Sequence, residues 1–171
     1  MVPDNRIAVC PGSYDPVTYG HLDVISRAAT MFEQVIVAVV NLPIRKGKTL
    51  FEADERVRFV EHATSDLENV TVETFSTLVV EFAHARGAKA IVKGLRAISD
   101  FEYEFEMDQL NRRQAPDIES VYLMASPKFS FLRSSGVKEL ATFGGDIDDL
   151  VPGEVAVRLK EEVSRDSGAS R

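Results

Sequence analysis

Short apolar runs rich in β-branched residues alternate along the chain with longer segments of helical spacing. The apolar runs are Ile7–Cys10, Val35–Val40, Val70–Val72, Ala90–Val92 and Val121–Met124. Runs of this length and composition are typical of parallel strands that are buried on both faces. The pattern therefore predicts five buried strands.

Between and after these runs, apolar residues recur three and four positions apart. These segments are His21–Phe32, Ala53–Thr64, Thr77–Arg86, Phe101–Arg112, Val137–Thr142 and Glu154–Val163. In the first of them Leu22, Ile25 and Ala29 fall on one stripe, and in the second Val57 and Val60 do. Such stripes predict amphipathic helices that rest on a sheet.

The strand–helix alternation predicts right-handed βαβ units and an α/β fold with a doubly wound, five-stranded parallel sheet of the Rossmann-like kind. We expect one domain over residues 1–163 and a polar, frayed tail over residues 164–171. In such sheets ligands bind beyond the carboxyl ends of the strands, near the point where the strand order reverses. Residues that directly follow a strand are therefore the candidates for chemistry.

Composition narrows the range of functions. Acidic residues outnumber basic ones, 27 to 20, among 171 residues, so a broad cationic surface for nucleic acid is not expected. Cys10 is the single cysteine, which excludes a disulfide within the chain. The longest clean apolar run, Val35–Val40, is far shorter than the roughly 20 residues of a membrane span. Met1–Arg6 lacks the apolar core of a signal peptide, so we expect a cytoplasmic protein without a membrane partner.

The segment after the first strand, Pro11–His21, reads PGSYDPVTYGH and opens a helix. Ser13 offers a hydroxyl and a backbone N–H, and His21 falls in the first helical turn, where N–H groups and the helix dipole favour anions. The spacing matches neither a P-loop nor G-x-G-x-x-G. From this local chemistry an anion pocket and an ordinary turn with a capping histidine are both open.

The fourth strand runs into Lys93, Gly94, Leu95 and Arg96, where two cations flank a glycine and suit phosphate oxygens. Ser99–Glu102 then fits a capping box. Carboxylates four apart share one face of the helix that follows: Asp100, Glu104 and Asp108. This face is either solvated or lies near a cation or a partner, and Phe101 with Phe105 would point at a core or a partner.

Two further segments carry candidate contacts. Phe129–Glu139 combines hydroxyls with two cations before a late helix, which suits a polyphosphate but also fits ordinary serine capping. Asn41–Phe51 is a cationic connection that either contacts a ligand or is a solvated loop.

These segments resemble a known family. Thr18–His21 is similar to the T/H-x-G-H signature of nucleotidylyltransferases, and Pro11–His21 as a whole resembles the bacterial phosphopantetheine adenylyltransferase family. The string that begins KGLRAISDFEYE at Lys93 is similar to the second signature of that family. Phe129–Glu139 and the later Gly144–Asp146 resemble the third, except at Arg133, where the family usually has serine, and at Gly136, where it has a larger apolar residue.

The resemblance implies a nucleotidylyltransferase fold that transfers AMP from ATP to 4′-phosphopantetheine, giving dephospho-coenzyme A and pyrophosphate. It implies that Mg²⁺ is required and is largely carried by ATP, and the sequence shows no dedicated carboxylate cage for a metal ion. It also implies a homohexamer and makes coenzyme A a candidate feedback inhibitor.

Matched motif by motif, the family implies His21 as the catalytic residue. The implied ATP-binding residues are Ser13, Tyr14, His21, Gly94, Leu95, Arg96, Glu104, Phe129, Ser130, Phe131, Leu132, Arg133, Ser134 and Ser135. The implied phosphopantetheine-binding residues are Ser13, Arg45, Lys46, Val79 and Lys93. The connection at residues 41–51 is two residues longer than in the family, so its register leaves Arg45 or Lys46 in the phosphate-gripping position and Lys48 as the fallback.

Two other classes of function remain open at this stage. One is a nucleotidylyltransferase that uses a different phosphorylated acceptor. The other is a binding or regulatory module of the same architecture without catalysis, although such a module needs no transition-state donor such as His21.

Overall fold

The computed structural model describes residues 6–41 and 49–169, with side chains as far as Arg165. Arg45, Lys46 and Lys48 lie outside the described residues. The strands are β1 (Ile7–Gly12), β2 (Gln34–Val40), β3 (Val70–Phe75), β4 (Ala90–Leu95) and β5 (Glu119–Met124). The helices are α1 (Tyr19–Met31), α2 (Ala53–Ala63), α3 (Val79–Ala85), α4 (Ile98–Gln114), the 3₁₀ turn η1 (Pro127–Phe129), α5 (Ser134–Thr142) and α6 (Gly153–Ala169).

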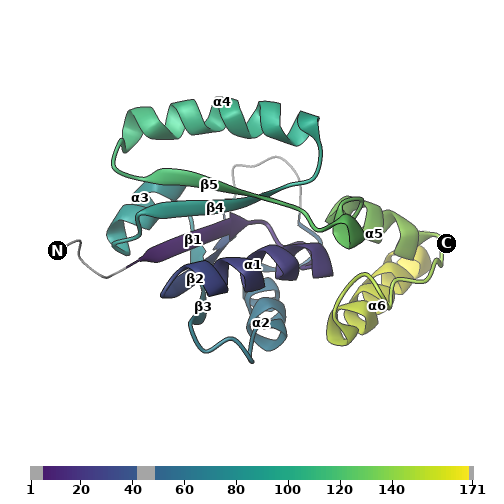
Figure 1. Ribbon diagram of the computed structural model, residues 1–171. Coiled ribbons are helices and arrows are strands. Elements are labelled where there is room, and N and C mark those ends of the chain that lie inside the picture. The colour runs from purple at the N-terminus through teal and green to yellow at the C-terminus, as the bar shows by residue number, and fades with distance from the viewer. Residues whose placement is uncertain (1–5, 42–48, 170–171) are drawn as a thin grey trace.

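The five strands form one parallel sheet in the order β3-β2-β1-β4-β5 (Figure 1). The predicted fold class is confirmed. Three strands, β1, β3 and β4, continue past the apolar runs that predicted them, so that Lys93 and Gly94 still pair with β5 through Tyr122 and Leu123. Backbone pairing does not end where the side chains turn polar, and it therefore carries these residues to the carboxyl edge of the sheet in extended form.

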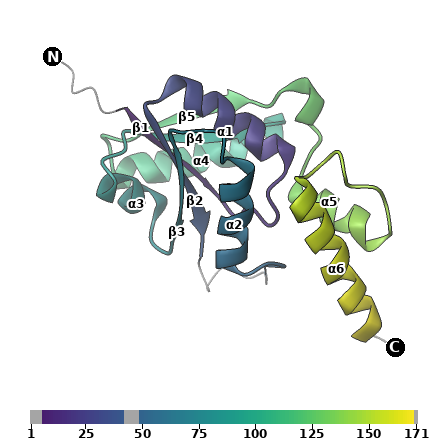
Figure 2. The same ribbon diagram turned by 90° about the horizontal axis from the view of Figure 1, so that it is seen from below.

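Alternate strand residues point to two separate apolar layers. Ala8, Val35, Val37 and Val39 pack with α1, α2, α5 and α6 in the larger core. Ile7, Val9, Ile36 and Ala38 pack with α3 on the other face. Both faces of the central strands are thus buried, which is why their sequences are continuously apolar. Figure 2 shows α1, α2 and α6 on one side of the sheet.

The strand order reverses between β1 and β4, and this pair is the least complete in the sheet. β1 pairs with β2 from Ile7 to Gly12, but with β4 only at Ala8 and Val9. The two central strands therefore separate toward their carboxyl ends. This split is the expected position of a ligand in a doubly wound sheet.

Two helices differ from their predicted bounds. The capping box predicted at Ser99–Glu102 is wrong, because α4 begins at Ile98 with Ala97 as its N-cap and no side-chain cap. The Asp100 carboxylate instead accepts a hydrogen bond from the backbone N–H of Arg96 (3.2 Å), a residue that lies one turn before Asp100 in the chain. At the other end of the chain, α6 continues through Ala169, beyond Val163, since adding polar residues to an existing helix costs little.

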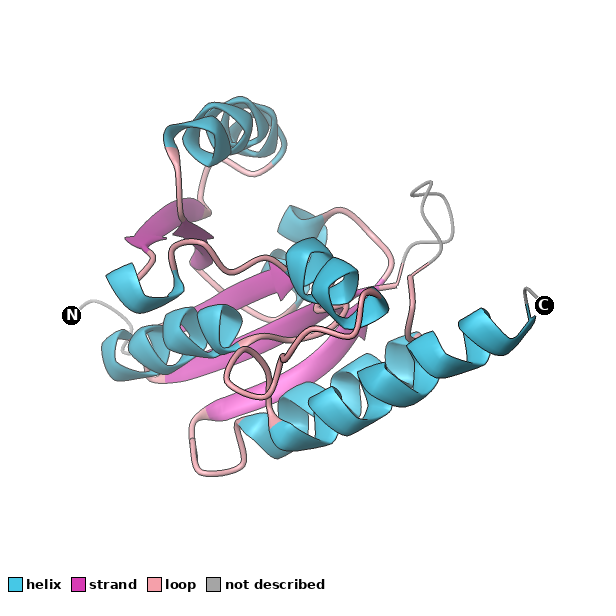
Figure 3. Cartoon of the chain, turned by 90° about the vertical axis from the view of Figure 1, so that its right-hand side faces the viewer, coloured by secondary structure: helices cyan, strands magenta, loops and turns pink. Residues whose placement is uncertain are grey.

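Helix α4 stands apart from the packed layers (Figures 1 and 3). None of its residues is buried. Within the described ranges, no helix is long and apolar enough to cross a membrane.

Candidate active site

The turn after β1 is built around a tyrosine. Tyr14 adopts a positive φ of 47° and is 4% exposed, and its hydroxyl donates to the carbonyl oxygen of Cys10 (2.9 Å). A Cβ on Gly12 would lie 2.9 Å from the Tyr14 ring, so glycine is required for the ring to fold back. Tyr14 was predicted to contact ATP; its side chain lies in the core, which leaves its backbone for that role. The inward ring fixes the neighbouring Ser13 in the turn.

His21 forms a capping box with Thr18 at the start of α1. The backbone N–H of Thr18 donates to His21 Nδ1 (3.0 Å), and the backbone N–H of His21 donates to Thr18 Oγ1 (3.4 Å). Because Nδ1 accepts a hydrogen bond from an amide, the neutral ring carries its proton on Nε2. The edge of the ring also packs on Tyr14, with the centroids 5.1 Å apart. The structure therefore presents His21 as an oriented Nε2–H donor.

The charge state of His21 follows from its surroundings. Desolvation of the imidazole, with a smaller contribution from the positive charge of Arg96, lowers the pKa of His21 to about 4. At neutral pH the ring is therefore uncharged and donates from Nε2 alone. His21 can therefore both cap α1 and take part in an anion pocket, because the cap uses Nδ1 and leaves Nε2–H for the anion.

The second segment brings two predicted binding residues into direct contact. Lys93, at the carboxyl end of β4, forms an ion pair with Glu104 of α4, and both side chains are mostly buried. Arg96 donates through Nε to Asp100 (3.1 Å) and through Nη1 to the carbonyl oxygen of Leu132 (3.1 Å). The carboxylates of α4 thus hold the two cations at the end of β4, so this acidic face lies near cations rather than facing solvent alone.

Gly94 has a packing role that the sequence did not suggest. A Cβ at Gly94 would lie 2.8 Å from Cγ2 of Val24. Its missing side chain lets α1 approach β4 where β1 and β4 have separated. We had expected this glycine to serve phosphate contact; the structure shows that helix packing already requires it.

The third segment mixes buried and exposed residues. Leu132 is 5% exposed and packs in the larger core, whereas Phe131 is 70% exposed. The Ser134 hydroxyl donates to the carbonyl oxygen of Pro16 (2.8 Å), which ties the start of α5 to the first segment. Arg133 and Ser135 are exposed, and their side chains form no hydrogen bond with the part of the chain that the structure describes. Their side chains are therefore available to a ligand.

The three segments contact one another in every pairing. The first meets the third at Gly20, where a Cβ would lie 3.7 Å from Leu132 and Phe129. The second meets the third through Arg96 and Leu132. The second meets α1, the helix that the first segment opens, through Gly94 and Val24, and the charge of Arg96 acts on His21. The structure therefore assembles residues from positions 13 to 135 at the split in the sheet.

Sequence reasoning missed a second layer behind this site. Asp15 is 5% exposed and accepts from the N–H groups of Leu50 (2.9 Å) and Phe51 (3.0 Å) and from the Lys138 ammonium (2.9 Å). Arg56 is 3% exposed on α2. A signal for Arg56 existed, since it falls on the apolar stripe of its helix, three residues after Ala53 and four before Val60.

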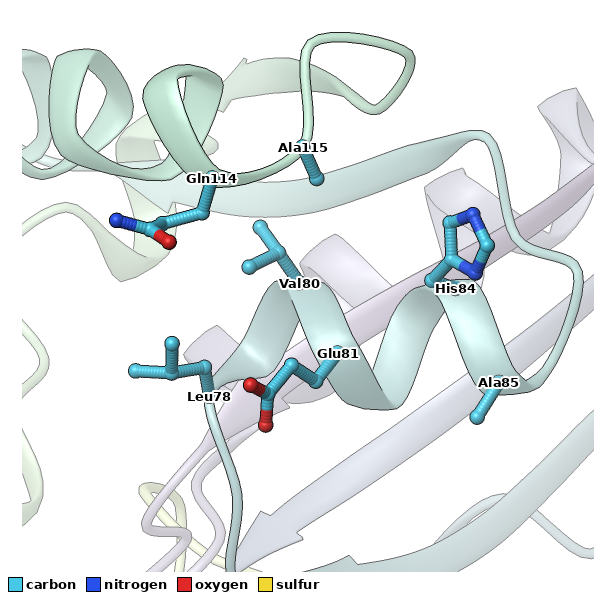
Figure 4. Close-up of a pocket in the computed structure, with 7 residues that line it drawn as sticks. All are labelled: Leu78, Val80, Glu81, His84, Ala85, Gln114 and Ala115. Atoms are coloured by element: carbon cyan, nitrogen blue, oxygen red, sulfur yellow. The ribbon is translucent and has the colours of Figure 1, made fainter.

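Val79, the predicted wall for an apolar substrate arm, lies at the start of α3 on the opposite face of the sheet from α1. A pocket of about 320 Å³ lies beside it, between α3 and the end of α4 (Figure 4). Its lining residues are Leu78, Val80, Glu81, His84, Ala85, Gln114 and Ala115. None of the predicted site residues lines it, so it is separate from the site at the split.

The described residues contain no group of three or more His, Cys, Asp or Glu side chains that could hold a metal ion. The carboxylates nearest the site are already engaged, Glu104 by Lys93 and Asp100 by Arg96. This donor set does not provide a protein cage for a divalent cation.

Comparisons with known proteins identify the family of the chain. Residues 9–140 match the cytidylyltransferase-like family. The chain is 50% identical over 163 residues to a phosphopantetheine adenylyltransferase of Rubrobacter xylanophilus, covering 95% of this chain and 98% of that protein. It is 48% identical to the protein of that name from Caldanaerobacter subterraneus subsp. tengcongensis, covering 94% and 99%. The chain belongs to the phosphopantetheine adenylyltransferase family.

More distant proteins of known structure share this fold. A crystal structure titled as a putative nicotinate-nucleotide adenylyltransferase from Vibrio parahaemolyticus superposes with a TM-score of 0.69 at 17% identity. The match covers 94% of this chain and 96% of that one. At this identity the likeness shows the shared fold alone, and the assignment to the phosphopantetheine adenylyltransferase family rests on the closer relatives.

Proposed function

We propose that this chain transfers AMP from ATP to 4′-phosphopantetheine and releases dephospho-coenzyme A and pyrophosphate. The observation that carries the proposal is the orientation of His21, whose Nδ1 is engaged by Thr18 and whose Nε2–H is left to donate beside Arg96. Membership of the phosphopantetheine adenylyltransferase family supplies the identity of the acceptor.

The chemistry needs no general base. An oxygen of the acceptor phosphate is already anionic and attacks the α-phosphorus of ATP in line. The bond from the α-phosphorus to the bridging oxygen breaks, and pyrophosphate leaves with the electron pair. Catalysis is then positioning and stabilisation of the charge that develops on the α-phosphate oxygens. His21 donates from Nε2 to one of those oxygens.

The cations divide between the two substrates. Arg96 and the segment Phe129–Ser135 hold the β- and γ-phosphates, with Mg²⁺ carried by ATP itself. Ser13 orients the incoming phosphate, and Lys93 with Arg45 or Lys46 holds the acceptor. Lys93 is paired with Glu104 in this structure, so acceptor binding exchanges one anionic partner for another.

We further propose that the protein is cytoplasmic and self-associates, as a homohexamer by its family. Support for association comes from α4, which has no buried residue and exposes Ile98 (81%), Phe101 (47%) and Phe105 (54%) on one stripe. Tyr103 and Leu110 form a second exposed stripe on another side of the helix. A helix that carries this much exposed apolar surface fits an interface between chains. Coenzyme A, which contains the product, is the proposed feedback inhibitor.

The decisive experiment is pyrophosphate release with ATP, Mg²⁺ and 4′-phosphopantetheine, with the nucleotide product identified by mass. Turnover that requires all three and yields dephospho-coenzyme A is the expected result. If turnover occurs only with another phosphorylated acceptor, that acceptor would take the place of 4′-phosphopantetheine in the proposal. ATP binding without turnover on any acceptor would leave a binding module and overturn the proposal.

A further inference from the structure

Arg56 is a buried cation that contacts no carboxylate in an ion pair within the described part of the chain. Its guanidinium donates instead to three backbone carbonyls. Nη1 donates to Ser13 (2.5 Å) and Val40 (3.0 Å), and Nε donates to Phe51 (3.0 Å). The charges of Asp15 and Glu52 act on the guanidinium only from beyond ion-pair distance, and burying a charge without a directly paired counter-ion is costly. An apolar residue such as methionine would suit this stripe of α2 better if Arg56 served the core alone.

The three carbonyls occupy particular places in the chain. Ser13 lies in the turn after β1, which is part of the site. Val40 is the last residue of β2, and Phe51 lies two residues before α2, so these two bracket the connection at residues 41–50. Arg56 therefore ties both ends of that connection to the Ser13 turn.

Asp15 complements this arrangement from the other side of the same backbone. It accepts from the amides of Leu50 and Phe51, while Arg56 donates to the carbonyl of Phe51. Phe51 is thus held at both its N–H and its C=O. The planar guanidinium is suited to this task because it presents several donors in fixed directions, which a lysine ammonium does not.

We propose that Arg56 is a positioning residue for the acceptor phosphate, holding the Ser13 turn at a fixed distance from both ends of the connection between β2 and α2. The proposal rests on the proposed function, which places Ser13 and a cation of this connection on the acceptor. Arg56 makes no hydrogen bond to Arg96 or to the Phe129–Ser135 segment, where the β- and γ-phosphates of ATP are expected. Its effect therefore falls on the acceptor side.

The test compares Arg56→Met and Arg56→Lys with the wild type in steady-state kinetics. We expect the KM for 4′-phosphopantetheine to rise roughly 10- to 100-fold in Arg56→Met, because small misplacements of a binding group weaken its action strongly. The KM for ATP should rise several-fold less, since Arg56 does not touch Arg96 or the Phe129–Ser135 segment, which supply most of the expected ATP contacts. Arg56→Lys keeps the charge but not the planar array of donors, so its KM for 4′-phosphopantetheine should lie between those of the wild type and Arg56→Met.

Arg158→Met is the matched control. Arg158 of α6 pairs with Glu55 of α2 and lies over the Phe51 ring, 5.5 Å from its centroid, but does not touch Ser13. The variant removes a guanidinium that contacts the same helix, α2, through Glu55 and that lies over the same phenylalanine. If Arg56→Met and Arg158→Met change both KM values alike, in proportion to their loss in Tm, Arg56 is merely structural and the proposal is overturned.

Amide hydrogen exchange separates this proposal from the proposed function. Exchange at Leu50 and Phe51 should be faster in Arg56→Lys than in the wild type, with β5 unchanged as an internal reference. Unchanged exchange at these amides would refute the positioning role whether or not the wild type turns over. A wild type inactive on 4′-phosphopantetheine, with faster exchange in the variant, would instead refute the acceptor assignment.

Discussion

At the scale of single residues, the function depends on one oriented hydrogen on His21. Removing it by His21→Ala should lower kcat by about 100- to 1000-fold, as loss of one preorganised transition-state donor typically does. The KM for ATP should change little, because the ground-state phosphates are held by Arg96 and the third segment. Steady-state kinetics with both substrates measures the split. A large loss of ATP affinity with unchanged turnover would assign His21 to binding instead.

The lowered pKa of His21 makes a second prediction at this scale. Its value of about 4 means that lowering the pH from 7 leaves the ring neutral until well below the ordinary histidine range. Protonation of Nδ1 near pH 4 would place a hydrogen against the Thr18 N–H and break the cap. The pH profile of kcat/KM for ATP should therefore show no break due to His21 between about pH 5.5 and 7.5, so any break in that range should also appear in His21→Ala.

A break near pH 6.5 would contradict this expectation, provided that it is absent from His21→Ala. His62→Gln is the control, because His62 is exposed and pairs with Glu154 (2.7 Å) on the surface. Its profile should match that of the wild type.

Residue types in a motif were predictable, but the partners of those residues were not. His21, Lys93 and Arg96 stand out because each lies in a segment that comes after one of the apolar runs of the sequence. Asp15 and Arg56 were missed because they bond to groups far away in the sequence, such as Leu50 N–H, 35 positions from Asp15, and the Ser13 carbonyl, 43 positions from Arg56, which leave no pattern in the local sequence. The same holds for Lys93 and Glu104: each was assigned to a ligand, and the structure pairs them with each other.

At the scale of elements, Gly94 is where α1 and β4 meet. Gly94→Ala would place a Cβ 2.8 Å from Val24, and such overpacking typically costs about 1–3 kcal/mol. We expect this loss in the free energy of unfolding by urea, and we expect Val24→Ala to recover part of it in the double variant. Additive losses in the double-variant cycle would show that the two residues do not meet.

The elements themselves were largely predictable, because buried parallel strands and amphipathic helices leave strong periodic patterns. The residues at which the elements begin and end were less predictable. The strands run on through Gly12, Phe75 and Leu95 since pairing follows the backbone rather than hydropathy. Helix α4 begins at Ile98 because Asp100 bonds back to Arg96, an arrangement that a capping-box pattern at Ser99 does not distinguish.

At the scale of the whole molecule, the site exists because β1 and β4 separate at their carboxyl ends. Three segments, from the first, fourth and fifth strands onward, converge on that split and contact one another. The sequence predicted that such a point exists in a doubly wound sheet. It could not say which helix fills the split, which depends on the fit of Val24 against Gly94.

The exposed apolar surface of α4 also belongs to this scale. A 17-residue helix without a buried residue is marginal alone, and two phenylalanines packed on each other at its surface, Phe101 and Phe105 (5.9 Å between centroids), need a further apolar partner. If chains associate through α4, Phe101→Glu should dissociate the assembly, because a buried unpaired carboxylate is strongly unfavourable at an interface. Sedimentation velocity should then show a smaller mass than for the wild type.

Phe143→Glu is the control for this prediction, because Phe143 is 82% exposed and follows α5, away from α4. It makes the same chemical change at an exposed aromatic residue and should leave the mass unchanged. Turnover belongs in the same experiment, since Glu104 and Asp100 of α4 hold Lys93 and Arg96. If association steadies α4, dissociation should lower activity along with mass, and activity should return as protein concentration rises. A monomeric wild type, or a Phe101→Glu variant with unchanged mass, would rule out α4 as the interface.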